Sequence, residues 1–155
     1  MRALLLLAAA ALLAAPASAL SAKQTVEKEI TIQNADGTET LVRQPADEVT
    51  PGERVVYSLH YTNDQSEPVS GITLVMPVPE ETSYVEGTAE RPGATLAVST
   101  DGGASFGPRG AATVVGADGT PRRAEAADIT HLRWTVAGPV APGTTDALVF
   151  KADLK

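Results

Sequence analysis

Hydrophobic and polar residues alternate with a period of two in several segments of this chain. The segment VVYSLHYT at residues 55–62 places Val, Tyr, Leu and Tyr on one face and Val, Ser, His and Thr on the other. The segments THLRWTV at residues 130–136 and ALVFKADL at residues 147–154 alternate in the same way. This period is typical of antiparallel β-strands with one buried face.

Weaker alternation predicts six further strands, at residues 26–33, 39–43, 71–76, 84–88, 95–99 and 113–115. The 13 glycines and 11 prolines are spread along the chain, and past the first 19 residues no window has sustained helical periodicity. Many short strands without intervening helices favour two packed sheets. The sequence therefore predicts an all-β fold, an antiparallel β-sandwich of about 7–9 strands.

Three Asp-Gly dipeptides lie between predicted strands. The tetrapeptide Ala-Asp-Gly-Thr occurs at residues 35–38 and again at residues 117–120, and Asp101-Gly102 is the third instance. Asp-Gly favours the positive φ angles of type I′ turns, which match the twist of a β-hairpin. The three dipeptides are therefore predicted to be hairpin tips.

The first 19 residues have the pattern of a secretory signal peptide. Arg2 precedes an uninterrupted apolar run at residues 4–15, and Ala-Ser-Ala at residues 17–19 supplies small residues for cleavage. The run is shorter than the roughly 20 residues that span a bilayer. We expect a cleavable signal helix at 1–19, a mature chain from Leu20, and a periplasmic or secreted protein without a transmembrane span. Residues 20–155 are predicted to form a single domain, with N-terminal strands at 20–45 and the sandwich at 46–155.

Composition narrows the classes of partner. The net charge is −7, and loss of Arg2 with the signal would make it one unit more negative. Nucleic acids and anionic membranes attract basic surfaces, so neither is an expected partner. The chain has no cysteine, so its stability has to come from packing rather than from disulfides. The expected partner is an unidentified envelope or extracellular protein.

The segment STDGGASFG at residues 99–107 fits two functional motifs. It resembles the Asp-box of sialidase-type propellers, S-x-D-x-G-x-[ST]-[WF], in which the Asp and Ser bond the turn of a hairpin. A propeller needs several four-stranded blades, however, and this chain has one box. The second half fits the G-x-S-x-G motif of serine hydrolases, but no helix-forming segment follows the Ser. We interpret the segment as a structural turn formed by Asp101, Gly103, Ser105 and Phe106, with Phe106 covering the end of the sandwich.

No metal or cofactor site is expected. The two histidines, His60 and His131, lie at alternating positions of predicted strands, where both would face solvent. With only these two isolated histidines and no cysteine, the chain is not expected to form a zinc site of the usual kind. Calcium remains an alternative if the turn carboxylates of Asp36, Asp101 and Asp118 converge, although turn aspartates usually bond their own backbone.

Residues 46–154 resemble a family of bacterial surface repeats, domain of unknown function 11. The segment VTPGERVVYSLHYTN at residues 49–63 is similar to the family pattern V-x-P-G-[DE]-x-V-x-Y, and PVPEETSYVEG at residues 77–87 and LRWTV at residues 132–136 continue it. The resemblance implies an immunoglobulin-like sandwich that is exported. The family usually has an Asp shortly before the first Pro of the second segment, where this chain has Val75-Met76; a cation bound through that Asp would be lost here.

The expected function is that of a non-catalytic module with a structural or protein-interaction role in the cell envelope. The alternative is a small ligand-binding or hydrolytic protein that uses the Asp101–Ser105 loop. The two differ in whether Asp101 and Ser105 point into their own turn or into a cleft shared with a histidine. In either case Trp134 is predicted to be buried together with Leu132, Tyr57, Leu59 and Phe150.

Overall fold

The computed structural model describes residues 20–155, and the predicted signal peptide at residues 1–19 lies outside them. The described chain is nearly all β, with two 3₁₀ turns, η1 (Arg109–Ala111) and η2 (Ala126–Asp128). Neither is long enough to cross a membrane, and these residues contain no other helix that could.

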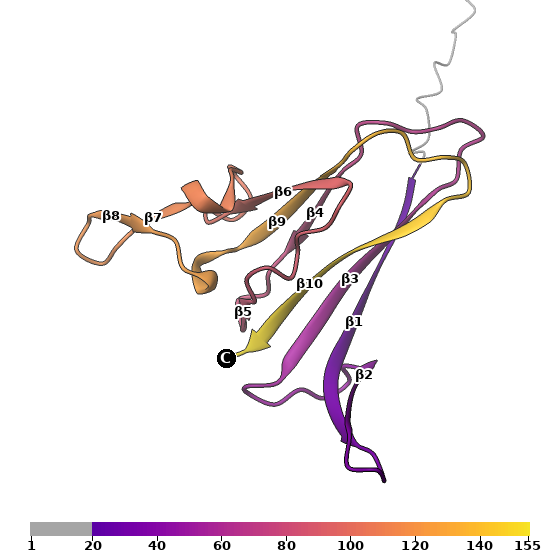
Figure 1. The fold of residues 1–155 in the computed structure, drawn as a ribbon. Coiled ribbons are helices and arrows are strands. Elements are labelled where there is room, and N and C mark those ends of the chain that lie inside the picture. The colour runs from indigo at the N-terminus through magenta and orange to yellow at the C-terminus, as the bar shows by residue number, and fades with distance from the viewer. Residues whose placement is uncertain (1–19) are drawn as a thin grey trace, which may run out of the picture.

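The strands of residues 20–155 form three antiparallel sheets (Figure 1). The five-stranded sheet contains, in spatial order, β2 (Glu39–Pro45), β1 (Leu20–Gln33), β3 (Arg54–Asn63), β10 (Thr145–Leu154) and β5 (Thr82–Tyr84). The three-stranded sheet contains β4 (Thr73–Pro77), β9 (His131–Val136) and β6 (Ala94–Ser99). A separate hairpin contains β7 (Thr113–Val115) and β8 (Pro121–Arg123).

The core lies between the five-stranded and three-stranded sheets, as in a β-sandwich. Alternate residues of β3 and β10 face alternate residues of β9, and Trp134, Leu132 and Phe150 are completely buried. Tyr57 stacks on Phe150 with ring centroids 4.9 Å apart. The predicted core is confirmed for these residues, whereas Leu59 only packs against its margin and is half-buried.

Most predicted strands are present, with local differences. Strands β3, β9 and β10 fall where alternation is strongest, and β6 and β7 fall on the weaker predicted segments at residues 95–99 and 113–115. The predicted strand at residues 84–88 is displaced, because β5 ends at Tyr84. Strand β8 has the sequence Pro-Arg-Arg, which does not alternate and was not predicted. Strand β1 begins at Leu20 and pairs with β3 over nine positions, so residues 20–45 belong to the same sheet as the strands that follow them.

The Asp-Gly turns are not of the predicted type. At the tip of the β1–β2 hairpin, the Gly37 N–H donates to Asn34 O over 3.0 Å and the Asn34 N–H donates to Thr38 O over 2.8 Å. Only Gly37 has a positive φ, +83°, and Asp36 does not. This is a type I turn followed by a left-handed glycine bulge, not a type I′ turn. Residues 116–120 repeat the geometry in the β7–β8 hairpin.

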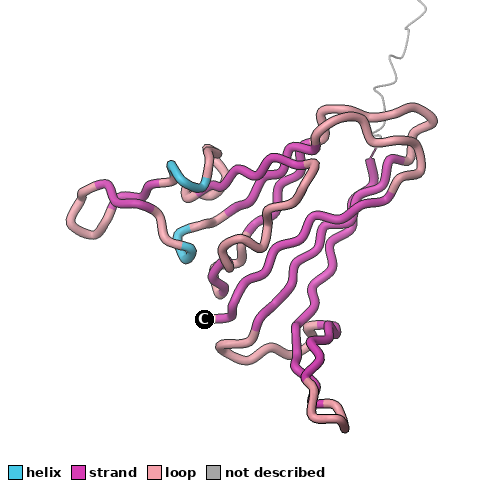
Figure 2. The backbone as a smooth tube through the Cα atoms, viewed as in Figure 1, coloured by secondary structure: helices cyan, strands magenta, loops and turns pink. Residues whose placement is uncertain are grey.

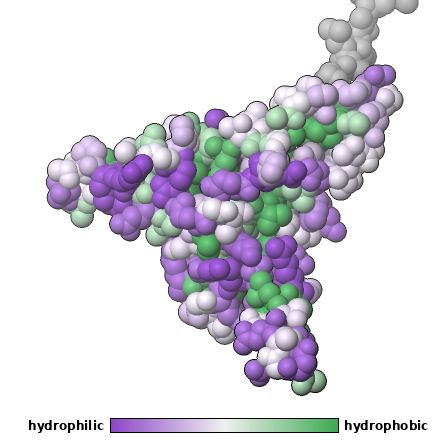
Figure 3. Space-filling view, in the orientation of Figure 1, coloured by the Kyte–Doolittle hydropathy of each residue, from purple (hydrophilic) through white to green (hydrophobic). Residues whose placement is uncertain are grey.

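Two hairpins extend away from the packed core (Figures 1 and 2). The β7–β8 hairpin projects at one end and exposes Val115. The far ends of β1 and β2 extend past the three-stranded sheet, so Val26, Ile32 and Leu41 are 39%, 44% and 58% exposed. Figure 3 shows apolar surface among hydrophilic side chains toward the end of the molecule that the β1–β2 hairpin forms.

Candidate functional site

The segment at residues 99–107 begins where β6 ends and returns alongside it. Ser99 is the last residue of β6 and pairs directly with His131, the first residue of β9. Eight residues later the chain is again beside β6, because Val98 and Gly107 exchange two backbone hydrogen bonds of 2.9 and 3.0 Å. The third Asp-Gly dipeptide therefore lies in a wide loop rather than at a tight hairpin tip.

Asp101 accepts hydrogen bonds from both serines of this loop. The Ser99 hydroxyl donates to Asp101 Oδ1 over 2.6 Å, and the Ser105 hydroxyl donates to Asp101 Oδ2 over 2.5 Å. The backbone N–H of Ser105 also donates to Oδ1 over 2.9 Å. These donors, Ser105 first and then Ser99, hold the pKa of Asp101 far below its usual range. The carboxylate is therefore charged and directed into its own loop.

The loop is also attached to the three-stranded sheet through its glycines. The Gly102 N–H donates to Thr130 Oγ1 over 3.0 Å, and the Gly103 N–H donates to Ser99 Oγ over 2.9 Å. Both glycines have positive φ, +75° and +87°. A Cβ at Gly103 would lie 3.4 Å from the ring of His131. The backbone of the loop thus lies close against the face of the imidazole.

Phe106 does not cover the end of the sandwich, which corrects the prediction from the sequence. The Val98–Gly107 bridge places Phe106 opposite Ser99, on the outer face of the three-stranded sheet. There the Arg133 guanidinium lies over the ring, 4.4 Å from its centroid, in cation–π geometry. Phe106 thus attaches the loop to the solvent side of β9, while the inner face of that strand packs in the core.

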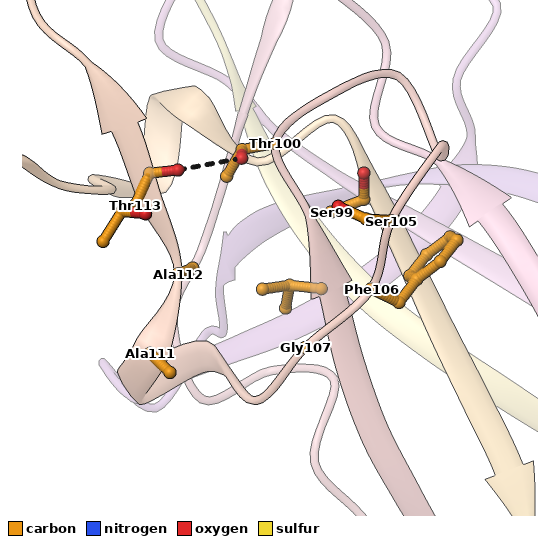
Figure 4. A pocket seen from close by; sticks show the side chains of 9 residues that line it. Ser99, Thr100, Ser105, Phe106, Gly107, Ala111, Ala112 and Thr113 are labelled. Atoms are coloured by element: carbon orange, nitrogen blue, oxygen red, sulfur yellow. Dashed lines mark hydrogen bonds between the residues drawn. The ribbon is translucent and has the colours of Figure 1, made fainter. Parts of the chain in front are cut away.

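Ser105 and His131 line different hollows. One hollow of about 210 Å³ lies between the loop and η1, and its lining includes Ser99, Ser105 and Phe106 (Figure 4). A second hollow of about 410 Å³ is lined by Gly102, His131 and residues 77–80, among others. Neither hollow is lined by both Ser105 and a histidine.

The other histidine is remote from the loop. His60 lies on the outer face of the five-stranded sheet, where its Nε2 is 3.3 Å from Thr25 Oγ1. His131 lies on the outer face of the three-stranded sheet, with Nδ1 3.2 Å from Thr130 Oγ1. Because the core separates these two faces, the histidines cannot act together.

The turn carboxylates are held separately. Asp36 accepts from the Thr38 backbone N–H and hydroxyl, and Asp118 accepts from the same two groups of Thr120. Asp36 and Asp118 lie at the tips of different hairpins, and Asp101 lies in the loop after β6. Within residues 20–155 no three His, Asp or Glu side chains are grouped closely enough to bind a metal ion.

Sequence reasoning did not identify two residues that organise this loop, Thr130 and Arg133. Thr130 donates to Ser99 O and accepts from the Gly102 N–H. Its contribution depends on the pairing of β6 with β9, for which no local signal exists. Arg133 is an outward residue of an alternating strand, and such a residue can be matched to an aromatic partner only once the loop is placed.

Comparisons with models of protein families, with curated proteins and with solved structures give no match to this chain.

Proposed function

We propose that the protein is an exported, non-catalytic module of the immunoglobulin-like type, with a structural or protein-interaction role in the cell envelope. The apolar run at residues 4–15 followed by Ala-Ser-Ala supports export. The order of motifs across residues 46–154, together with two facing antiparallel sheets, supports the fold type. Its partner is an envelope or extracellular protein in the periplasm or outside the cell.

The observation that supports a non-catalytic role is the closure of Asp101 and Ser105 on each other. A serine nucleophile has to donate its proton to a base, and that base is usually a histidine. The Ser105 hydroxyl donates to Asp101 instead, over 2.5 Å, and that carboxylate is a weak base because its pKa is lowered. In this loop the Ser105 hydroxyl and the Asp101 carboxylate are bonded to each other, whereas a hydrolase would need its serine hydroxyl bonded to a base that can accept the proton.

Hydrolysis assays test this proposal directly. The purified protein is offered ester, glycoside and peptide substrates beside two variants, Ser105→Ala and His131→Ala. We expect no turnover above that of buffer for any of the three proteins. Turnover by the unchanged protein that is lost in Ser105→Ala, with an unchanged melting temperature, would overturn the non-catalytic assignment.

Export is tested separately by mass spectrometry of the protein recovered from the cell envelope and the medium. We expect a mature chain that begins at Leu20. An intact Met1 end on the bulk of the protein, recovered with the cytoplasm, would contradict export and leave the hydrolysis result unaffected.

A second candidate function, binding of a small ligand, is favoured by the hollow of about 410 Å³ beside His131. Its lining combines the apolar Pro77, Val78, Pro79 and Ile129 with polar groups, which is the usual composition of a ligand pocket. The polar groups come from Glu80, Thr82, Thr130, His131 and Lys155. A fragment screen by NMR distinguishes the two functions. Specific shifts confined to these residues would favour ligand binding, and their absence would favour the module.

A further inference from the structure

Strand β2 lies at one edge of the five-stranded sheet. The backbone hydrogen bonds at its two ends show which of its residues bond to β1. At one end the Ala46 N–H donates to Val26 O, and at the other the Asn34 N–H donates to Thr38 O. In an antiparallel ladder every second residue bonds to a given neighbour. The residues of β2 that bond to β1 are therefore Thr40, Val42 and Gln44.

The intervening residues Glu39, Leu41 and Arg43 direct their backbone N–H and C=O groups away from β1. A free edge of this kind is a template for another strand. The opposite edge of the same sheet is β5, which has only three residues. Strand β2 has seven residues and exposes Leu41 by 58%, so it is the better template.

We infer that β2 is a self-association edge, on which two copies of this chain pair antiparallel about a twofold axis at Leu41. In this register Leu41 lies opposite the partner's Leu41, and Arg43 lies opposite the partner's Glu39 on both sides of the axis. All three pairs join residues whose backbone groups point outward, so each exchanges two hydrogen bonds. The two five-stranded sheets become one continuous sheet.

The charges on the outer face are complementary in this register. Arg43 already bonds Glu29 on its own β1, with Nε 3.4 Å from Oε1, and its side chain is 42% exposed. The partner's Glu39 approaches from the other side and places Arg43 between two carboxylates. Cross-strand pairs of opposite charge stabilise a sheet, whereas like charges destabilise it.

The inner face is apolar across the same junction. Within one copy, Ile32 pairs with Thr40 and Ile30 pairs with Val42. The twofold axis then aligns Ile32, Thr40, the partner's Val42 and the partner's Ile30 in one row, and the symmetric row runs in the opposite direction. These are β-branched residues, which pack well across strands. The row continues this face across the junction from Ile32, which is 44% exposed in the single chain.

A register centred on Val42 is less favourable. It would place Glu39 opposite the partner's Pro45, which has no N–H to donate. It would also place Leu41 opposite the partner's Arg43, so neither the apolar nor the charged residues would be matched. The Leu41 register is therefore the one that the side chains select.

Analytical ultracentrifugation of the purified protein over a range of concentrations tests the inference. The unchanged protein should dimerise, and Leu41→Lys should weaken the dimer roughly tenfold or more, because two like charges replace the apolar pair. Glu39→Arg should weaken it similarly, since Arg then faces Arg on both sides of the axis. Val115, an aliphatic residue on the other hairpin, is 71% exposed and Leu41 is 58% exposed, so Val115→Lys is the matched control and should leave the dimer unchanged.

Mixing two variants gives a sharper test. Glu39→Arg has two arginines on its edge and Arg43→Glu has two glutamates, so each alone should dimerise poorly. Mixed, they should form a heterodimer with both charge pairs restored. If Arg43→Glu destabilises the fold through its contact with Glu29, Leu41→Lys and Glu39→Arg decide the question, because Glu39 is matched to a charge only in the Leu41 register.

A protein that stays monomeric up to roughly 1 mM would overturn the inference. So would a dimer that is indifferent to Leu41→Lys or Glu39→Arg, or a dimer that Val115→Lys disrupts equally. The inference goes beyond the proposed function and does not depend on it. A monomeric protein would leave the non-catalytic module in place, and hydrolysis by Ser105 would leave the dimer in place.

Discussion

The Trp134 indole N–H donates a hydrogen bond of 2.8 Å to the carbonyl oxygen of Ala89, 45 residues earlier in the chain. Both residues are buried, Trp134 completely. The bond ties the segment after β5 to the centre of the three-stranded sheet. It also satisfies a donor that would otherwise be costly to bury.

Two substitutions at Trp134 separate its packing from its hydrogen bond. Trp134→Ala should lower the free energy of unfolding by about 3–5 kcal/mol, because it leaves a cavity at the centre of the core. Trp134→Phe retains much of the ring and should cost about 1–3 kcal/mol, mainly because the Ala89 carbonyl loses its donor. Urea denaturation measures both. A loss under about 1 kcal/mol for Trp134→Ala would contradict the burial of this side chain.

The Asp101 carboxylate should matter more for stability than the Ser105 hydroxyl that it binds. Asp101→Ala removes the acceptor of three hydrogen bonds at once, including that of the buried Ser99 hydroxyl. Ser105→Ala removes only one of these bonds. We therefore expect a clearly larger decrease in melting temperature for Asp101→Ala than for Ser105→Ala, with Asp101→Asn between them. An unchanged melting temperature in Asp101→Ala would contradict a structural role for the loop.

The glycines of the loop offer a matched comparison. Gly102 and Gly103 have positive φ, so an Ala at either position should cost about 1–2 kcal/mol. Gly107 does not have a positive φ, and a Cβ there would meet no atom within 4 Å. Gly107→Ala should be neutral or slightly stabilising, because it reduces the freedom of the unfolded chain. Equal losses for all three, measured by thermal denaturation, would mean that backbone conformation is not the cause.

Acid should destabilise the fold partly through Asp146. The Arg91 guanidinium bonds both oxygens of this carboxylate, over 3.0 and 2.7 Å, and the Tyr61 hydroxyl donates to it over 3.2 Å. The hydrogen bonds from Arg91 are the main cause that lowers the pKa of Asp146 below its usual value of 3.8, and the Tyr61 hydroxyl adds to the effect. A carboxyl with a lowered pKa stabilises the fold above its unfolded pKa, and this stability is lost as the pH falls through its folded pKa.

Stability should therefore fall as the pH decreases below about 4, and Asp146→Asn should make this part of the profile flatter. At neutral pH Asp146→Asn should lower the free energy of unfolding by on the order of 1 kcal/mol, since the Arg91–Asp146 pair is partly exposed and solvent screens it. Tyr61→Phe, which retains Arg91, serves as the control and should preserve most of the slope. Denaturation at a series of pH values gives both results, and an unchanged slope in Asp146→Asn would contradict this assignment.

The sequence by itself determined the strands whose side chains alternate between core and solvent. The segments around Tyr57, Trp134 and Phe150 could be placed because the pattern is local and each strand has one apolar face. Sequence also located the hairpin tips at Asp36 and Asp118, since a glycine after Asp permits the left-handed conformation that a tight turn requires.

Only the tertiary structure decided the features that depend on pairing between distant segments. Strand β5 begins at Thr82, opposite Leu154 at the end of β10, and β8 forms because the turn at Asp118 returns the chain to β7. Phe106 faces outward because Gly107 pairs with Val98. Backbone pairing decides which face a side chain occupies, and a shift of one residue reverses it. For this reason neither the stacking of Phe106 on Arg133 nor the free edge at Leu41 could be derived from local pattern.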